Sequence, residues 1–315
     1  MTDLQLLTVG RVSVDLYAQQ PNVSLNDVTS FQKSVGGTAT NVAVAAARLG
    51  VRSAVATKVG DDAFGAYVRH ALENTFAVDT RFVGIDPDLG TPLAFAELNP
   101  PGDPTIIFYR EPKAPDMNIE VADFDLDVVR DVDVFWVPAS RFHDEPSATT
   151  VRVLLEERRR REHTVLDLDW RPMFWESMSQ ARSAVEPMLQ HATIAIGNRT
   201  ECEMAVGEID PDRAADALLE HGLSAAIVKL GEQGVLLATA DGQRESIPPY
   251  RVEVVCGLGA GDAFGGAFVH ALICGMALSE AVKRGNAAGA IVAGRMMCAD
   301  DMPTNQDMDE FLENR

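Results

Sequence analysis

The stretch CGLGAGDAFGG, from Cys256 to Gly266, decides how this chain folds and what chemistry it carries. Five of its eleven residues are glycine, and an apolar, helix-like segment follows. A helix N-terminus exposes unpaired N–H groups and a partial positive charge, and glycines let a ligand approach them closely. We therefore expect Gly259, Ala260 and Gly261 to form an anion site for a phosphate or a developing oxyanion.

Asp262 stands at the mouth of this expected site. Its carboxylate would repel a phosphate, but it is well placed to take a proton from a hydroxyl group that attacks one. Glycines for the anion and an aspartate as base indicate phosphoryl transfer. The dinucleotide fingerprint G-x-G-x-x-G fails because Asp262 occupies its last position, and the chain has no G-x-x-x-x-G-K-[ST] loop. The pattern alone also fits an alternative interpretation, in which the glycine-rich helix start only packs tightly and binds no ligand.

Composition limits the class of protein. The chain has 315 residues, 46% of them hydrophobic, and a formal net charge of −20, so it can bury a large core. No basic patch predicts nucleic-acid binding; the one arginine-rich run, Arg158 to Arg161, is expected on a solvated helix face. The four cysteines lack metal or disulfide spacing, and no signal peptide or membrane span is predicted. We expect a soluble, cytoplasmic protein without nucleic-acid or membrane partners.

Short apolar runs alternate with amphipathic stretches along the chain. Residues 6–16 read as a strand and 40–50 as an Ala-rich helix, and the alternation continues through DVFWVPA, EHTVLDLD, ATIAIGN and AAIVKLG. Strands alternating with helices predict an α/β fold with a mainly parallel sheet covered on both faces. Two segments, about 16–35 and 88–112, have strand-like residues and turn formers but no helix. We expect them to form a small sheet that projects from the main body.

Five short motifs resemble those of one enzyme family. GAGDAF near the C-terminus resembles the second signature of the ribokinase-like carbohydrate kinases, the PfkB family, and GGTATNVAVAAARLG at 36–50 resembles the first. VKLGEQG, NRTE and NAAGA resemble its nucleotide-side loop, its N-x-x-E motif and the helix beside the adenine. The resemblance implies a ribokinase-like, Rossmann-type three-layer fold in a single domain, 1–315, with the two helix-free segments as a β-sheet lid.

The resemblance also implies roles for the motif residues, with ATP and Mg²⁺ in the C-terminal third and a sugar between the main sheet and the lid. The residues so implied are Asp262, Gly259, Ala260 and Gly261 for catalysis; Asp15, Gly36, Gly37 and Asn41 for the sugar; Asn198, Lys229, Gly231, Glu232, Gly234 and Asn286 for the nucleotide; and Glu201 for the metal. Cys256 and Gly257 replace the Asp-Thr pair that helps many relatives to hold a monovalent cation, so potassium activation stays open.

Two stretches indicate an acidic sugar. DLDWRPMFW places Arg171 just past the expected end of a strand, and IIFYREPKAPDM places Tyr109 and Arg110 on the expected lid. Arginine suits a carboxylate because its fork donates two parallel hydrogen bonds. Both stretches resemble those of family members that phosphorylate 2-keto-3-deoxygluconate and, more closely, 5-dehydro-2-deoxygluconate, a sugar acid of inositol breakdown.

Several alternatives to that substrate stay open. They are a 2-keto-3-deoxygluconate kinase, a kinase of a neutral sugar such as fructose or ribose, and a sensor that binds a nucleotide and a sugar acid without turnover. Intact Asp262 argues against the sensor, because a protein that only binds needs no base. Small sheets with exposed faces often pair, so a homodimer through the lid is expected.

Overall fold

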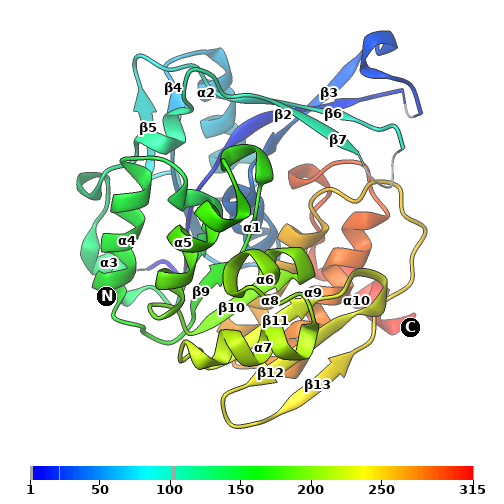
Figure 1. Ribbon diagram of the computed structural model, residues 1–315. Helices are drawn as coiled ribbons and strands as arrows, with labels where there is room; N and C mark the ends of the chain where they lie inside the picture. The colour runs from blue at the N-terminus through cyan, green and yellow to red at the C-terminus, as the bar shows by residue number, and fades with distance from the viewer. Residues whose placement is uncertain (1–2, 21, 101–103, 315) are drawn as a thin grey trace.

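The computed structural model describes all residues except 1–2, 21, 101–103 and 315. Within these residues, a nine-stranded sheet forms the main body and a four-stranded sheet projects from it (Figure 1). The strands of the larger sheet are β1 (Leu6–Val9), β4 (Ser53–Gly60), β5 (Val83–Asp86), β8 (Val134–Pro138), β9 (Thr164–Asp167), β10 (Ile194–Asn198), β11 (Ala225–Lys229), β12 (Val235–Thr239) and β13 (Arg244–Ile247).

The larger sheet has the order β13-β12-β11-β10-β9-β8-β1-β4-β5. Its strands pair in parallel except β11 with β12 and β12 with β13, which are antiparallel. The covering helices are α1 (Thr38–Arg48), α2 (Ala63–His70), α3 (Leu126–Asp131), α4 (Ser147–Arg158), α5 (Met178–Leu189), α6 (Arg199–Val206), α7 (Pro211–Glu220), α8 (Ala260–Ile273), α9 (Leu278–Ala293) and α10 (Asn305–Glu313). The structure is thus the three-layer α/β fold that the alternating pattern predicts.

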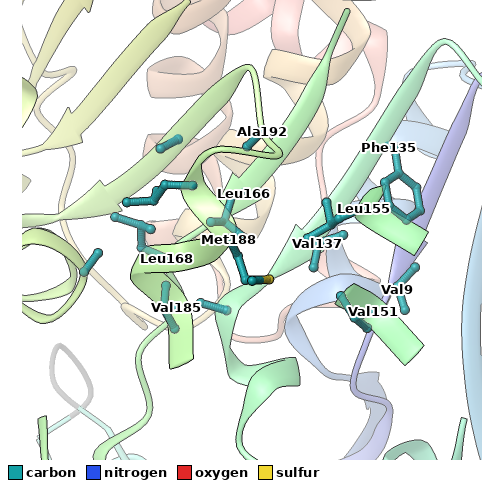
Figure 2. Close-up of a cluster of buried hydrophobic side chains, with 14 of the residues drawn as sticks. Val9, Phe135, Val137, Val151, Leu155, Leu166, Leu168, Val185, Met188 and Ala192 are labelled. Atoms are coloured by element: carbon teal, nitrogen blue, oxygen red, sulfur yellow. The ribbon is translucent and has the colours of Figure 1, made fainter. Parts of the chain in front are cut away.

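Alternate residues of each central strand pack into different cores. In β8, Phe135 and Val137 face a core built with α3 to α7, whereas Val134 and Trp136 face one built with α1, α8 and α9. Figure 2 shows the first core, where Val137 and Leu166 lie near Met188 of α5. Because both faces are covered, these strands are continuous apolar runs. Within the described residues, no helix is long and apolar enough to cross a bilayer.

The smaller sheet, which we call the lid, has the order β3-β2-β6-β7. Its strands are β2 (Ser13–Ala18), β3 (Phe31–Gly36), β6 (Leu93–Glu97) and β7 (Thr105–Tyr109). The single strand expected at 6–16 is therefore two strands, β1 in the main sheet and β2 in the lid. The break comes at Gly10, where a Cβ would lie 2.6 Å from the Cβ of Ala39 in α1. This close approach of α1 separates the two strands, and the chain passes into the lid.

The arginine-rich run at the end of α4 is not uniformly solvated. Arg158 is 2% exposed, and its guanidinium donates hydrogen bonds to Thr164 Oγ1 and to the backbone carbonyls of Val129, Arg130, Val132, Asp133 and Glu162. Several of these carbonyls end α3, where they have no partner within the helix. The prediction of a solvated face was wrong for Arg158, because this arginine satisfies a buried helix end.

Candidate active site

Two cavities adjoin the glycine-rich start of α8. The larger, of about 660 Å³, is lined by Gly257, Ala260 and Gly261 on this side, and the smaller, of about 70 Å³, by Leu258, Gly259 and Asp262. Neighbouring residues of one segment therefore face different cavities. The start of α8 separates the two spaces and is open to both, as a site that passes a group from one ligand to another requires.

The conformation of this segment depends on glycine. Gly259 immediately precedes α8 in a left-handed conformation, with φ of 78°, and a Cβ there would lie 2.7 Å from Cys298 Sγ. The first N–H groups of α8 are consequently free of side-chain cover. Lys229 Nζ lies 3.5 Å from the position that a Cβ of Gly261 would take. An ammonium group and a helix N-terminus thus stand together where an anion would bind.

Asp262 lies in the first turn of α8. Its Oδ2 accepts a hydrogen bond of 2.8 Å from Asn41 Nδ2, and burial raises its pKa to about 6 although this bond opposes the shift. Asn41 belongs to α1. This helix packs closely against α8, because Gly266 of α8 has no side chain and a Cβ there would collide with Ala45 of α1. A carboxylate with this pKa is ionised at neutral pH and close to the range that suits a general base.

The larger cavity collects most of the residues expected to bind the nucleotide. Its lining includes Lys229, Gly231, Glu232, Gly234 and Asn286, from β11, the loop after it and α9. Its volume is within the range of cofactor sites in proteins. The side chain of Asn286 donates a hydrogen bond of 3.2 Å to the carbonyl of Pro248. It therefore also holds the segment after β13, which forms another part of the cavity wall.

Asn198 and Glu201 do not line either cavity. They form the capping box of α6, in which each side chain accepts a hydrogen bond from the other residue's backbone N–H. Glu201 Oε2 nevertheless lies 3.9 Å from Lys229 Nζ, so its carboxylate is close to the expected phosphate position. Among the described residues, no group of three or more His, Cys, Asp or Glu side chains could hold a metal ion.

The smaller cavity lies between the lid and the main sheet, and we call it the sugar cavity after the ligand that the sequence predicts there. It brings together five of the residues predicted to contact that ligand, namely Asp15, Gly37, Asn41, Arg110 and Arg171. Gly36 does not line the cavity, but a Cβ there would collide with the carboxylate of Asp15. The Asp15 carboxylate accepts a hydrogen bond of 2.6 Å from Ser13 Oγ, and burial raises its pKa to about 6.

Tyr109 is not brought into the sugar cavity. It is 62% exposed on β7, whereas Ile106 and Phe108 of the same strand line the cavity. Side chains alternate between the two faces of a strand, so Tyr109 points away from the cavity when Phe108 points into it. The aromatic ring that borders the cavity at this point of the lid belongs to Phe108, the residue before Tyr109.

The sequence interpretation missed a network of buried ions beside this cavity. Asp169 accepts hydrogen bonds from Arg11 Nη2 (2.8 Å), Arg171 Nε (2.9 Å) and Ser140 Oγ (2.6 Å). Burial acts to raise the pKa of Asp169, but Arg11 and Arg171 hold it well below its usual range. The one local signal was a charged residue inside an apolar run, since Arg11 interrupts LLTVGRVSV.

A second buried carboxylate holds two more arginines. Asp116 Oδ1 lies 2.6 Å from Arg110 Nη2 and 3.2 Å from Arg141 Nη1. Asp116 and Arg141 are fully buried, and the Arg110 side chain is 10% exposed. Burial would raise the pKa of Asp116, but Arg110 and Arg141 lower it below its ordinary value. Two aspartates therefore hold four arginines, and three of these, Arg11, Arg110 and Arg171, line the sugar cavity.

Comparison with known proteins gives consistent matches. The family model described as pfkB family carbohydrate kinase matches residues 3–305. The chain is 34% identical to a 5-dehydro-2-deoxygluconokinase of Photobacterium profundum over 99% of this chain and 96% of that protein. It is 29% identical to 5-dehydro-2-deoxygluconokinase 1 of Bacillus cereus, over 98% and 94% of the two chains.

Solved structures show the same fold. A fructokinase with bound ATP from Xylella fastidiosa matches with a TM-score of 0.84 at 23% identity, over 98% of both chains. An aminoimidazole riboside kinase from Salmonella enterica, complexed with aminoimidazole riboside and an ATP analog, matches with a TM-score of 0.81 at 25% identity, over 98% of this chain and 99% of that one. The matches extend over both sheets, since they cover nearly the full length.

Proposed function

The chain belongs to the PfkB family of carbohydrate kinases and is an ATP-dependent sugar kinase, and from that premise we propose that it phosphorylates a sugar acid. The acid that we propose is 5-dehydro-2-deoxygluconate, with the 6-hydroxyl group as acceptor, as in myo-inositol breakdown. The observation that carries this proposal is the lining of the sugar cavity by Arg11, Arg110 and Arg171. In a chain of net charge −20, three arginines at one small cavity suit an anionic substrate.

The proposed chemistry starts at Asp262. Its carboxylate would take the proton of the acceptor hydroxyl while that oxygen attacks the γ-phosphorus of ATP; the bond from this phosphorus to the β,γ-bridging oxygen would break, and ADP would leave. Asn41 holds the carboxylate in place by its 2.8 Å hydrogen bond. The base stands on the sugar side of the α8 N-terminus, and the nucleotide cavity opens on the other side, an arrangement that supports an in-line transfer between the two cavities.

The residues before and beside Asp262 stabilise the transferred group. The free N–H groups at Gly259, Ala260 and Gly261 and the ammonium of Lys229 would donate to the phosphoryl oxygens. Bound ATP supplies the phosphoryl group, and Mg²⁺ neutralises its negative charge. Of the residues at the site, Glu201 would hold Mg²⁺ as an outer partner through water, because its carboxylate lies 3.9 Å from Lys229 Nζ.

The lid completes the site. Ala94, Ile106 and Phe108 of the lid strands line the sugar cavity, and we propose that these strands move when a sugar enters. Closure afterwards excludes water and protects ATP from hydrolysis. We propose that the outer face of the lid, where Ile107 and Tyr109 are 37% and 62% exposed, pairs with a second copy of the chain.

Two measurements test these proposals. A coupled ATP-dependent assay across 5-dehydro-2-deoxygluconate, 2-keto-3-deoxygluconate, fructose and ribose should give the highest kcat/KM with the first. A higher kcat/KM with fructose or ribose than with both acids would replace the proposal with a neutral-sugar kinase. Light scattering across a concentration series should give twice the 34.0 kDa of one chain, and the monomer mass throughout would refute the dimer.

A further inference from the structure

Arg11 is the most deeply buried arginine of the sugar cavity. It lies in the connection between β1 and β2, and its side chain is 5% exposed, compared with 10% for Arg110 and 37% for Arg171. Its backbone carbonyl accepts a hydrogen bond of 2.8 Å from Thr40 Oγ1 of α1. The position of Arg11 relative to the cavity is therefore fixed by the main body and does not depend on the lid.

The guanidinium of Arg11 has a donor without a partner. Nη2 donates to Thr38 Oγ1 at 2.7 Å and to Asp169 Oδ2 at 2.8 Å. Nε is buried and has no hydrogen-bond partner. Buried donors are almost always paired in folded proteins, and an exception needs an explanation. Opening of the lid strands that border the same cavity would let a ligand oxygen reach this buried Nε and supply the missing acceptor.

The charges around this donor are unbalanced. Asp169 is shared by Arg11 and Arg171, and Asp116 is shared by Arg110 and Arg141. All four guanidiniums stay protonated in proteins, so these four arginines carry two more charges than the two aspartates that bind them. Burial lowers the pKa of Arg11, and Asp169 offsets part of that effect. An anionic ligand group would balance the excess charge.

Arg11 and Arg110 also share an aromatic neighbour. Their guanidinium carbons lie 5.3 Å and 5.7 Å from the centre of the Phe174 ring. Both side chains are thus held at one place, one from the main body and one from the end of the lid. Burial raises the pKa of Asp262, and the charge of Arg171 opposes that shift. Arg11 and Arg110 are gathered beside Phe174, and there we place the far end of a substrate.

Building on the sugar-acid function proposed above, we propose that Arg11 binds the carboxylate of the substrate together with Arg110, donating from its free Nε. Arg11 then determines the preference of the enzyme for an acid over a neutral sugar of the same shape. Asp15 and Asp262, the acidic groups that line the same cavity, bind the hydroxyl end of the molecule.

The test compares 5-dehydro-2-deoxygluconate with its neutral carboxamide in the full-length enzyme. The wild type should prefer the acid by about ten- to a hundredfold in kcat/KM, as expected for a hydrogen bond to a charged group. Arg11→Gln should reduce that ratio about tenfold or more, mainly through KM for the acid. Arg11→Lys keeps the charge but lacks the Nε donor, and we expect it to lose part of the preference. Calorimetric binding of the acid without ATP gives a readout that is independent of turnover.

Arg158→Gln is the matched control. Arg158 is also buried, but it binds backbone carbonyls at the end of α3 and lines neither cavity, so the acid-to-amide ratio should be unchanged even if the fold is less stable. A wild type without acid preference would refute the sugar-acid function itself. An acid-preferring wild type whose Arg11→Gln variant keeps the ratio would overturn only the role of Arg11. If Arg11→Gln does not fold, a full ratio in Arg11→Lys overturns the role of Nε.

Discussion

Replacing Asp262 with asparagine should make the protein inactive and more stable. Asparagine keeps the shape and can still accept the hydrogen bond from Asn41, but it cannot take a proton. Loss of a general base lowers kcat by about 10²–10⁴-fold. Burial raises the pKa of Asp262 from 3.8 to about 6, and two pKa units correspond to about 3 kcal/mol. Because Asp262 is partly exposed, solvent screening reduces the expected gain to roughly 1–2 kcal/mol.

The pH dependence of the stability difference between Asp262→Asn and the wild type shows whether the gain comes from removing a buried charge. Because the pKa of Asp262 is raised in the folded state, its ionised form destabilises the fold. The full cost applies above pH 6, and the cost becomes smaller as the pH falls toward 3.8. The higher Tm of Asp262→Asn, by roughly 1.5–3 °C at pH 7.5, should therefore shrink by about half at pH 5. Thermal unfolding at both pH values measures this difference, and a coupled assay at saturating ATP measures kcat.

Glu280→Gln is the control for charge removal at a helix start. Glu280 is exposed in the first turn of α9, so its loss should bring no gain in Tm and a small loss through the helix dipole. Retention of more than half the wild-type kcat in Asp262→Asn would refute the role of the base. An equal Tm gain at pH 5 and pH 7.5 would refute the cost assigned to its charge.

Two other predictions concern residues outside the sugar cavity. Arg158→Met should lower the free energy of unfolding in urea by about 3 kcal/mol or more, since it leaves several buried carbonyls without a donor. The exposed Arg152→Met on the same helix should change it by less than about 0.5 kcal/mol; equal losses would contradict the assigned role of Arg158. Glu201→Gln should raise the half-saturating Mg²⁺ concentration of the kinase reaction, and an unchanged titration would leave Glu201 as a helix cap only.

The parts of the site that could be predicted are those written in short stretches of sequence. The prediction of the glycines before α8, of Asp262 and of Asn41 needed only a local pattern, because each lies near the start of a helix and its motif is continuous in the sequence. The mainly parallel sheet could be predicted for a similar reason, since strands buried on both faces are continuous apolar runs. The roles of these site residues stay predictions until the variants are measured.

The missed features depend on contacts between distant segments. Arg11 and Asp169 are 158 positions apart, and nothing near either residue indicates that they form a buried pair. The burial of Arg158 likewise depends on the end of α3, which lies more than two dozen residues earlier. The orientation of Tyr109 required the register of β7, because a shift of one residue exchanges the two faces of a strand.

The sharing of each buried aspartate by two arginines limits how substrate preference can change during evolution or engineering. Removing Arg11 alone leaves Asp169 with one cation, and removing Asp169 alone releases both Arg11 and Arg171. Loss of one member of a buried ion network is costly, whereas replacing the whole set by apolar residues of similar volume is often neutral. A route to a neutral-sugar kinase would therefore pass through coordinated substitutions, and single variants along it would be less stable than either end.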